Sequence, residues 1–431
     1  MAGYGILIQV ETEERNQMKN TSCMNCGSAE LHRFIDLRDQ PNGNHFPDAE
    51  SKDKEPKFPF AMMVCRDCYQ VQIEEFPSPE FMFGEHPYVT GINKPVVDHF
   101  AKMAANTVKR FEIPENSLVI DIGCNDGTLL SKFKEQGMRV LGVDPGRLTG
   151  KLCRDSGITV CETFWNEETG KSIEQLKLQP QLITATAVFY HVQDIHDFIR
   201  GLSTVMSDDT IFMAQCVDMS DVVEKCQFDH FYHEHTMIHS VGPLKRLFGE
   251  HGMKVIDVEH VDIHGGSFII YAGLESNPTE ESPAVNAWIK KEEEAGMFKT
   301  GTFDEFTQRV EKNRDDLLDL LEKMKNEGKS VWALGAPLKG STLLNYCQIG
   351  PDLCQKAVEL NQFKIGKYTP GTHIPIEDET TQTEHPDYYL VLSWNFLDFF
   401  LEKYSDYLKA GGRFIVPNPE VRTIGSEALS G

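Results

Sequence analysis

The stretch from Val119 to Gly127, V-I-D-I-G-C-N-D-G, decides how this chain of 431 residues folds. An apolar run that ends in an acid and a glycine turn, followed by a helix-like segment at 128–136, is typical of the first strand, loop and helix of a nucleotide-type α/β domain. Such a loop lets a ligand approach the backbone. The dinucleotide fingerprint G-x-G-x-x-G is not met, because Gly123 is followed by C-N-D-G. The loop therefore disfavours NAD.

Acidic residues surround this loop. Asp121 and Asp126 flank the turn, where they would repel a pyrophosphate but would suit the ammonium and sulfonium of S-adenosylmethionine. A second apolar run ends in Asp144, about 20 residues on, where an acid accepts both ribose hydroxyls. The loop with its second acid resembles the class I methyltransferases, and another nucleotide-type crossover is the alternative. The expected residues that bind S-adenosylmethionine are Asp121, Gly123, Asn125, Gly127 and Asp144.

Composition and length limit the function classes. The chain has 42 Lys and Arg against 66 Asp and Glu, a formal net charge of −24, which argues against a general nucleic-acid or anionic-membrane surface. No apolar run is long enough to span a bilayer, and the first residues lack the pattern of a signal peptide. We therefore expect a cytoplasmic protein of about three domains.

Two C-x-x-C pairs stand out among the 11 cysteines. In a reducing compartment such pairs favour metal ligation over disulfides. Four thiolates make a closed, tetrahedral and therefore structural zinc site. The alternative is a redox pair or simply reduced thiols. The prolines between the two pairs exclude one continuous helix there. The predicted zinc ligands are Cys23, Cys26, Cys65 and Cys68.

Helix and strand signals alternate through the central part of the chain. Alternation predicts a mostly parallel sheet with helices on both faces and ligands at the carboxyl ends of the strands. His191 follows one predicted strand, so we expect it at this edge near the methyl donor, although a lone histidine is more often structural. The strands are expected at 117–121, 139–143, 182–187, 211–216 and 254–260, and the helices include 94–111, 128–136 and 241–251.

The segment from Gln227 to Ser240, Q-F-D-H-F-Y-H-E-H-T-M-I-H-S, holds four histidines. Because histidine titrates near neutrality, we interpret it as a proton-transfer site in which Tyr232 and Glu234 orient a histidine or stabilise an oxyanion. One alternative is a solvated, histidine-rich loop. The other is a second metal site formed by one of two pairs, His233 with His235 or His235 with His239.

A second α/β unit is predicted after a helical connector. Its first turn, G-A-P-L-K-G from Gly335, is suited to phosphate at a helix N-terminus, with Lys339, Lys364 and Lys367 adding local positive charge. The alternative is a folded domain without a ligand. The expected elements are strands at 330–334, 357–360, 388–392 and 413–416 and a helix at 341–346.

The order of these parts resembles the S-adenosylmethionine-dependent sugar C-methyltransferases, from Cys23 to about Val421. The matching motifs are the paired C-x-x-C, the G-x-N-D-G loop, F-Y-H-E-H, H-G-G-S and the C-terminal K-G-S-T-L-L-N-Y, G-K-Y-T-P-G-T-H-I-P-I and W-N. The resemblance implies an α/β protein with a small zinc module, a class I methyltransferase sheet and a second Rossmann-like domain. The implied domains are an extension at 1–20, a zinc-binding domain at 21–85, a methyltransferase domain at 86–273, a helical connector at 274–328 and a nucleotide-binding domain at 329–431.

The same resemblance implies a reaction in deoxysugar biosynthesis, methylation at C3 of a nucleotide-linked 4-keto deoxysugar. A histidine base removes the proton that the ketone acidifies, and the enolate takes the methyl group. The resemblance assigns His235 as the base, Tyr232 and Glu234 as supporting groups, and His191 and Tyr88 as further active-site groups. We expect the protein to bind a small molecule rather than nucleic acid or a membrane, and to be a monomer or a small homo-oligomer. The residues expected to hold the substrate nucleotide are Lys339, Asn345, Lys364 and Lys367.

Several departures from the family pattern concern the substrate rather than the base, and leave room for another nucleotide or ketone. They are Phe268 and Ile269 for the usual Leu-Arg, Pro337 and Leu338 before K-G, Gln362 within E-L-N-Q-F-K-I-G, and Gln215 for the usual acid. The alternatives are a methyltransferase acting on another ketone, a hydroxyl or an amine, and a non-catalytic binding protein. An NAD oxidoreductase that uses the C-terminal sheet is more distant.

Overall fold

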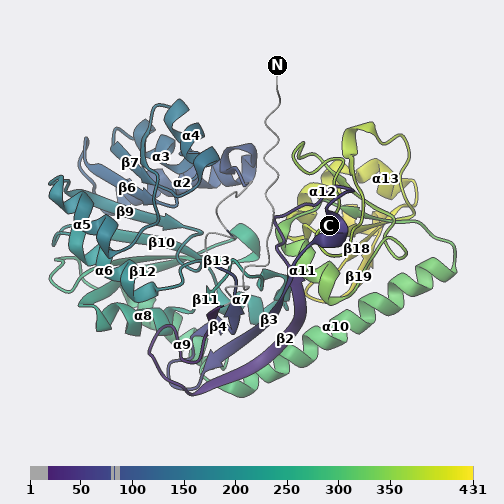
Figure 1. The fold of residues 1–431 in the computed structure, drawn as a ribbon, viewed down its shortest axis with the longest axis horizontal. Helices are drawn as coiled ribbons and strands as arrows, with labels where there is room; N and C mark the ends of the chain where they lie inside the picture. The colour runs from purple at the N-terminus through teal and green to yellow at the C-terminus, as the bar shows by residue number, and fades with distance from the viewer. Residues whose placement is uncertain (1–17, 79–81, 83–87, 431) are drawn as a thin grey trace.

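The structure is a computed structural model that describes residues 18–78, 82 and 88–430 (Figure 1). Most of the predicted N-terminal extension lies outside the described residues. The end of that extension is ordered, because β1 (Met18–Lys19) pairs antiparallel with β5 (Glu75–Phe76). Within the described residues, no helix is long and apolar enough to cross a membrane.

A seven-stranded sheet of order β12-β13-β10-β9-β6-β7-β8 forms the centre of the chain. All its neighbours pair in parallel except β13, which runs antiparallel to both β10 and β12. The strand order reverses between β6 and β9, which is where α/β sheets open a crevice for ligands. The strands are β6 (Leu118–Ile122), β7 (Arg139–Val143), β8 (Thr159–Cys161), β9 (Pro180–Thr186), β10 (Ile211–Val217), β12 (Met253–Val261) and β13 (Ser267–Leu274).

Helices cover both faces of this sheet, as predicted (Figure 1). Neighbouring residues of one strand point to opposite faces, so Val119 and Ile120, both fully buried, belong to two different hydrophobic clusters. The sequence reading missed β8, because a three-residue edge strand carries no clear alternation. The helices are α2 (Lys94–Arg110), α3 (Thr128–Glu135), α4 (Arg147–Asp155), α5 (Glu167–Gln175), α6 (Ile195–Val205), α7 (Met219–Glu224) and α8 (Val241–Glu250).

The two C-x-x-C pairs belong to a separate four-stranded sheet of order β11-β4-β3-β2. Three of its strands come from the N-terminal region: β2 (Leu31–Pro41), β3 (Lys57–Cys65) and β4 (Val71–Ile73). The fourth, β11 (Met237–Ile238), comes from the histidine-rich segment. The sequence gives no sign of this pairing, since the partners are more than 160 residues apart.

A six-stranded sheet of order β16-β15-β14-β17-β18-β19 forms the C-terminal part, which confirms the second α/β unit. The long helix α10 (Thr300–Asn326), preceded by α9 (Pro283–Glu294), reaches it from the central sheet (Figure 1). Helix α11 (Leu338–Tyr346) begins three residues earlier than predicted, so Lys339 is helical. The strands are β14 (Val331–Leu334), β15 (Lys356–Glu359), β16 (Ile376–Asp378), β17 (Tyr388–Val391), β18 (Arg413–Val416) and β19 (Arg422–Ile424).

The three parts pack around Phe231, which is fully buried. Its ring lies 6.1 Å from that of Phe34 on β2 and 5.9 Å from that of Phe306 on α10. Its backbone carbonyl accepts a hydrogen bond from Thr342 Oγ1 on α11 at 3.0 Å. The histidine-rich segment is therefore enclosed by all three parts of the chain.

Candidate active site between the two α/β sheets

The loop after β6 requires glycine at two positions. Gly123 has φ of +70°, and a Cβ there would lie 2.3 Å from Val188 Cγ2. Gly127 has φ of +81°, and a Cβ there would lie 2.9 Å from Cys153 Sγ. Both conformations are left-handed, a region that side chains other than glycine rarely adopt. The loop thus brings its backbone to the switch point of the sheet without side chains in the way.

Asp144, at the end of β7, holds this loop in place. Its carboxylate accepts hydrogen bonds from the backbone N–H of Asn125 at 2.9 Å, the N–H of Gly146 at 2.8 Å and Thr149 Oγ1 at 2.8 Å. A carboxylate offers about four acceptor positions, so three are used by the protein itself. About one remains for a ribose hydroxyl, fewer than the two that the sequence led us to expect.

Asp121, at the end of β6, is 3% exposed and accepts a 2.6 Å hydrogen bond from Thr184 Oγ1. Burial raises the pKa of its carboxyl to about 7, although the Thr184 bond acts in the opposite direction. Within the described residues it forms no ion pair with a cationic side chain. A buried carboxyl of this kind fits the cationic groups of S-adenosylmethionine, since a cation would stabilise its ionised form.

Residues 88–91 lie across the same loop. Asn125 Oδ1 accepts from the N–H and the hydroxyl of Thr90, and its Nδ2 donates to the carbonyl of Tyr88 at 3.0 Å. Asp126 accepts from the Gly91 N–H at 2.8 Å. Asn125 and Asp126 therefore use their side chains to close the cofactor loop, a role that the sequence did not indicate.

His235 is 2% exposed and has a defined tautomer. Its Nδ1 lies 2.7 Å from the backbone carbonyl of His230, which can only accept, so Nδ1 carries the proton. Nε2 then holds a lone pair in the neutral ring and has no hydrogen-bond partner in the part of the chain that is described. Burial, then the neighbouring His191 and His230, keep the pKa of His235 well below its ordinary value, so the ring is neutral near pH 7.

Two other predicted active-site groups pack against this ring. The ring centroids of Tyr232 and His191 lie 3.8 Å and 5.1 Å from that of His235. Tyr190, which the sequence reading missed although it precedes His191, packs edge-on at 4.6 Å. Tyr88, the third predicted group, has a side chain that is 42% exposed, and its phenol adds to the raised pKa of Tyr190 and Tyr232 after the larger effect of burial.

The remaining histidines of the segment face other partners. His233 Nε2 donates to the carbonyl of Pro59 at 3.2 Å, and His239 Nδ1 donates to Gln70 Oε1 at 3.2 Å. Burial lowers the pKa of both to about 4. Glu234 is also buried and accepts a 2.7 Å hydrogen bond from Asn44 Nδ2. Neither the solvated-loop alternative nor the second metal site agrees with these contacts, because the segment is buried and its histidines do not converge.

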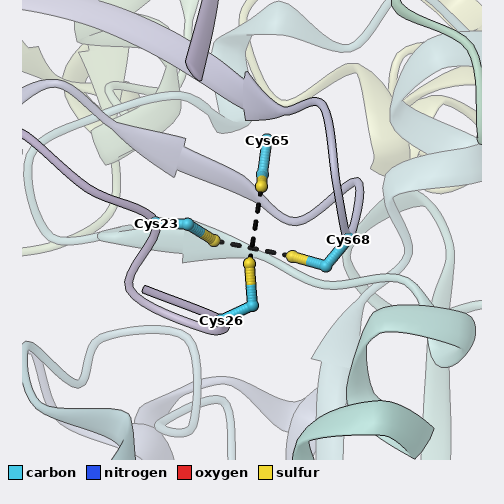
Figure 2. Close-up of side chains that lie close together, drawn as sticks. All are labelled: Cys23, Cys26, Cys65 and Cys68. Carbon is cyan, nitrogen blue, oxygen red and sulfur yellow. Dashed lines mark hydrogen bonds between the residues drawn. The ribbon is translucent and has the colours of Figure 1, made fainter. Parts of the chain in front are cut away.

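The four predicted zinc ligands do converge (Figure 2). Cys23 Sγ lies 3.5 Å from Cys68 Sγ, and Cys26 Sγ lies 3.6 Å from Cys65 Sγ. All four sulfur atoms lie within 4.8 Å of one another, and no other group of three or more such ligands occurs in the described chain. Tetrahedral zinc with Zn–S bonds of about 2.3 Å needs sulfur separations of about 3.8 Å, so the donor set fits zinc.

Of the four residues predicted to hold the nucleotide, Lys339 lies beside the histidine-rich segment. Its Nζ lies 4.0 Å from Asp229 Oδ2 and 4.0 Å from the ring centroid of Trp394. Nζ is buried, and no hydrogen-bond partner for it exists within the described residues. Burial lowers its pKa to about 8. Burial, and after it the charge of Lys339, lower the pKa of His230, which stacks 6.4 Å from His235. A buried ammonium, ion-paired with Asp229 but without a hydrogen-bond partner among the described residues, thus lies beside His230.

The other three predicted nucleotide-binding residues are not brought to Lys339. Asn345 Nδ2 donates to the carbonyls of Ser341 and Pro370, and Lys367 is exposed. Lys364 Nζ donates to the carbonyl of Ala336 at 2.8 Å. Lys364 therefore lies at the first turn of the second sheet, while Asn345 has a structural role in its own domain.

Glu359 repeats in the second sheet the arrangement of Asp144 in the first. It ends β15, the neighbour of β14, and accepts a 3.0 Å hydrogen bond from the N–H of Ala336 in the turn after β14. Gly335 in that turn has φ of +79°. In both α/β sheets, the turn after the strand at the switch point is held by an acid at the end of the neighbouring strand.

Comparison with known proteins gives three family models in chain order. A zinc binding domain matches residues 23–83, a methyltransferase domain matches 97–258, and a C-methyltransferase C-terminal domain matches 262–419. A curated relative, C-methyltransferase NovU of Streptomyces niveus, is 32% identical over 408 residues, covering 94% of this chain and 97% of the relative.

Solved structures give only weak likenesses. Magnesium protoporphyrin IX methyltransferase from Synechocystis PCC 6803 has 15% identity and a TM-score of 0.31, over 41% of this chain and 78% of that chain. An S-adenosylmethionine-dependent methyltransferase from Clostridium acetobutylicum has 10% identity and a TM-score of 0.33, over 41% and 92%. Likenesses of this size support no conclusion about function.

Proposed function

The chain belongs to the C-methyltransferase family and is an S-adenosylmethionine-dependent C-methyltransferase with a zinc-binding domain, and on that premise we propose that it methylates C3 of a nucleotide-linked 4-keto deoxysugar. The observation that carries this proposal is the neutral His235, with its lone pair on Nε2, near the buried ammonium of Lys339, which has no hydrogen-bond partner among the described residues. A base next to an anion site suits a carbon acid that carries phosphate. Residues 86–273 are proposed to hold the cofactor and 329–431 the substrate nucleotide.

His235 is the proposed base. The Nδ1 bond to the His230 carbonyl fixes the ring orientation, and the low pKa keeps Nε2 unprotonated. A carbon next to a ketone becomes a nucleophile only after deprotonation, so a base held in a fixed tautomer supports C-methylation. When bound, S-adenosylmethionine supplies an electrophilic methyl group for that carbon.

The phenols near His235 are proposed donors to the enolate oxygen. Burial raises the pKa of Tyr232 and Tyr190 well above the ordinary value of 10, so both hydroxyls stay protonated. A protonated donor in a water-poor site stabilises developing negative charge more than it would in water. His191, at a ring distance of 5.1 Å from His235, is proposed to share this task.

Lys339 is proposed to bind the phosphate next to the sugar. Asp229, 4.0 Å away, is already bonded to Trp394 Nε1 at 2.7 Å and to Asn418 Nδ2 at 3.1 Å, which leaves the ammonium available to an anionic ligand. Gln227 Oε1 and His230 Nε2 are also buried without a hydrogen-bond partner in the described chain. Lys364 and the turn at Gly335 are proposed to hold the rest of the nucleotide.

The test is mass spectrometry of the protein incubated in deuterated water with labelled S-adenosylmethionine and a panel of nucleotide-linked 4-keto sugars. We expect labelled methyl transfer and deuterium entry next to the ketone, both lost in His235→Ala. Lys339→Met should raise KM for the sugar at least about tenfold, the loss of a charged hydrogen bond. Lys290→Met, on an exposed lysine of α9 that is not among the predicted nucleotide-binding residues, is the control.

The outcomes separate the parts of the proposal. Deuterium entry that persists in His235→Ala would overturn the role of His235 as the base. Binding of S-adenosylmethionine without methylation or exchange of any sugar in the panel would overturn the substrate class. Equal KM values for Lys339→Met and Lys290→Met would overturn the phosphate site.

A further inference from the structure

The histidine-rich segment contributes one strand, β11, to the four-stranded sheet of the N-terminal region. That region, residues 23–73 with the four cysteines, is called the zinc module below. β11 pairs antiparallel with β4, with Met237 opposite Gln72 and Ile238 opposite Val71. The pairing extends to Thr236, whose carbonyl accepts from the N–H of Ile73 at 2.9 Å. This contact begins one residue after His235. The backbone on the C-terminal side of the proposed base is therefore fixed by the zinc-binding region.

Each C-x-x-C pair, Cys23 with Cys26 and Cys65 with Cys68, forms one knuckle of the zinc module. Gln70 connects the second knuckle directly to β11. It lies two residues after Cys68, is 1% exposed, and its backbone carbonyl accepts from the N–H of Cys65 at 3.0 Å. Its Nε2 donates to the carbonyls of Val71 at 2.8 Å and Ile238 at 3.0 Å, which fixes the orientation of the amide. The opposite oxygen then accepts from His239 Nδ1 at 3.2 Å. One side chain thus belongs to the knuckle and holds the base segment at two points.

The N-terminal side of His235 is tethered to the same module. Asn44 Nδ2 donates to Glu234 Oε1 at 2.7 Å. His233 Nε2 donates to the carbonyl of Pro59, and its ring packs edge-on at 4.8 Å against Phe60 of β3. Residues on both sides of the base, 233–234 and 236–239, are therefore held by residues 44–73.

We propose that the zinc module is a positioning device for the base, with Gln70 as the link through which metal loading sets the geometry of His235. Four-thiolate binding orders both knuckles, and knuckles of this kind lose their structure without metal. Without zinc, the residues around Cys65 and Cys68 no longer hold Gln70 in place. Gln70 then no longer holds β11, and the backbone next to His235 becomes more mobile. The kinetic part of this inference rests on the proposed role of His235, whereas the structural coupling does not.

Hydrogen exchange of the full-length zinc protein, measured by mass spectrometry, tests the coupling without a substrate. Gln70→Leu should raise the exchange of the peptide covering 233–240 at least about tenfold, while metal analysis still gives one zinc per chain. Gln72→Leu is the matched control. Gln72 is equally buried two residues further on, in β4, but its amide bonds to Met24 N at 2.8 Å and Ser22 O at 3.1 Å within the module. Unchanged exchange of 233–240 in Gln70→Leu would overturn the proposal.

Removal of zinc with excess chelator gives a second test. Exchange should rise in the knuckles and in 233–240 together, and added zinc should restore both. A rise confined to the knuckles would contradict the proposal. In the kinetic test, Asn44→Ala and Gln70→Leu should lower kcat on the order of 10- to 100-fold, as for other residues that orient functional groups, with unchanged affinity for S-adenosylmethionine. If no keto sugar reacts, the proposed function fails, while raised exchange in Gln70→Leu still supports the coupling.

Discussion

If Asp121 binds the cationic groups of the cofactor as proposed, we predict that its raised pKa makes cofactor affinity depend on pH. Burial raises this pKa to about 7, so at pH 7 about half of the free protein carries a protonated Asp121. A cationic ligand binds the ionised form, and binding below pH 7 must therefore release a proton. Because the pKa of free Asp121 is about 7, affinity is half of its maximum near pH 7, approaches the maximum about one pH unit higher, and is lost as the pH falls.

The magnitude follows from the ionised fraction. With a pKa of about 7, the ionised fraction falls from about one half at pH 7 to about 3% at pH 5.5. Affinity for S-adenosylmethionine should therefore weaken by about 15-fold over this range, approaching tenfold per pH unit. The α-amino group of the ligand, with a pKa of about 8, stays protonated throughout and does not contribute.

Titration calorimetry at pH 7, 6.5, 6 and 5.5, in buffers of different ionisation enthalpy, measures both the affinity and the protons released. Asp121→Asn should bind more weakly at pH 7 and show no dependence on pH in this range. Thr184→Val removes the 2.6 Å hydrogen bond that lowers the pKa, so the loss of affinity should begin at higher pH. A flat profile in the wild type, or an equal slope in Asp121→Asn, would refute the reasoning.

Two further predictions concern the fold around the site. Gly123→Ala should weaken S-adenosylmethionine binding at least about tenfold and cost about 1–2 kcal/mol for the left-handed backbone, more if Val188 cannot move, as measured by calorimetry and urea unfolding. Gly249→Ala in α8, where nothing lies within 4 Å of an added Cβ, is its control and should be neutral or stabilising. Phe231→Ala should lower the free energy of unfolding by about 3–5 kcal/mol, because it leaves a cavity where three parts of the chain meet. Phe399→Ala, at a side chain that is 56% exposed, should change it by less than about 0.5 kcal/mol, and equal losses would contradict this account of the junction.

Local sequence predicted the elements that depend on neighbouring residues. The strand, glycine turn and acid at Val119 to Gly127 gave the α/β sheet, since an apolar run before a glycine turn leaves few other conformations. The two C-x-x-C pairs gave the converging sulfur atoms, because zinc needs ligands of that type and number. Edge strands such as β8, β16 and β19 were missed because three residues carry too little pattern.

The sequence could name His235 and Lys339 as candidates but could not say which neighbours each would meet. The Nδ1 bond that sets the tautomer of His235 comes from the backbone of His230, and a backbone carbonyl has no sequence signal. Of the four residues expected to hold a nucleotide, only Lys339 lies beside the base cluster, because α11 packs against the segment at Asp229 while Asn345 turns to Pro370. Residue types alone do not distinguish these lysines.

The sequence by itself determined which residue types are available: an acidic glycine loop, four thiols of the type and number that zinc needs, and a histidine-rich segment that we propose for proton transfer. Tertiary structure alone decided how these parts act together, through the pairing of β11 with β4, the amide of Gln70 and the closure of Lys339 against Asp229. The physical reason is distance along the chain. Hydrogen-bond pairing and burial depend on which surfaces meet, and segments more than 160 residues apart meet only after the three parts of the chain have packed.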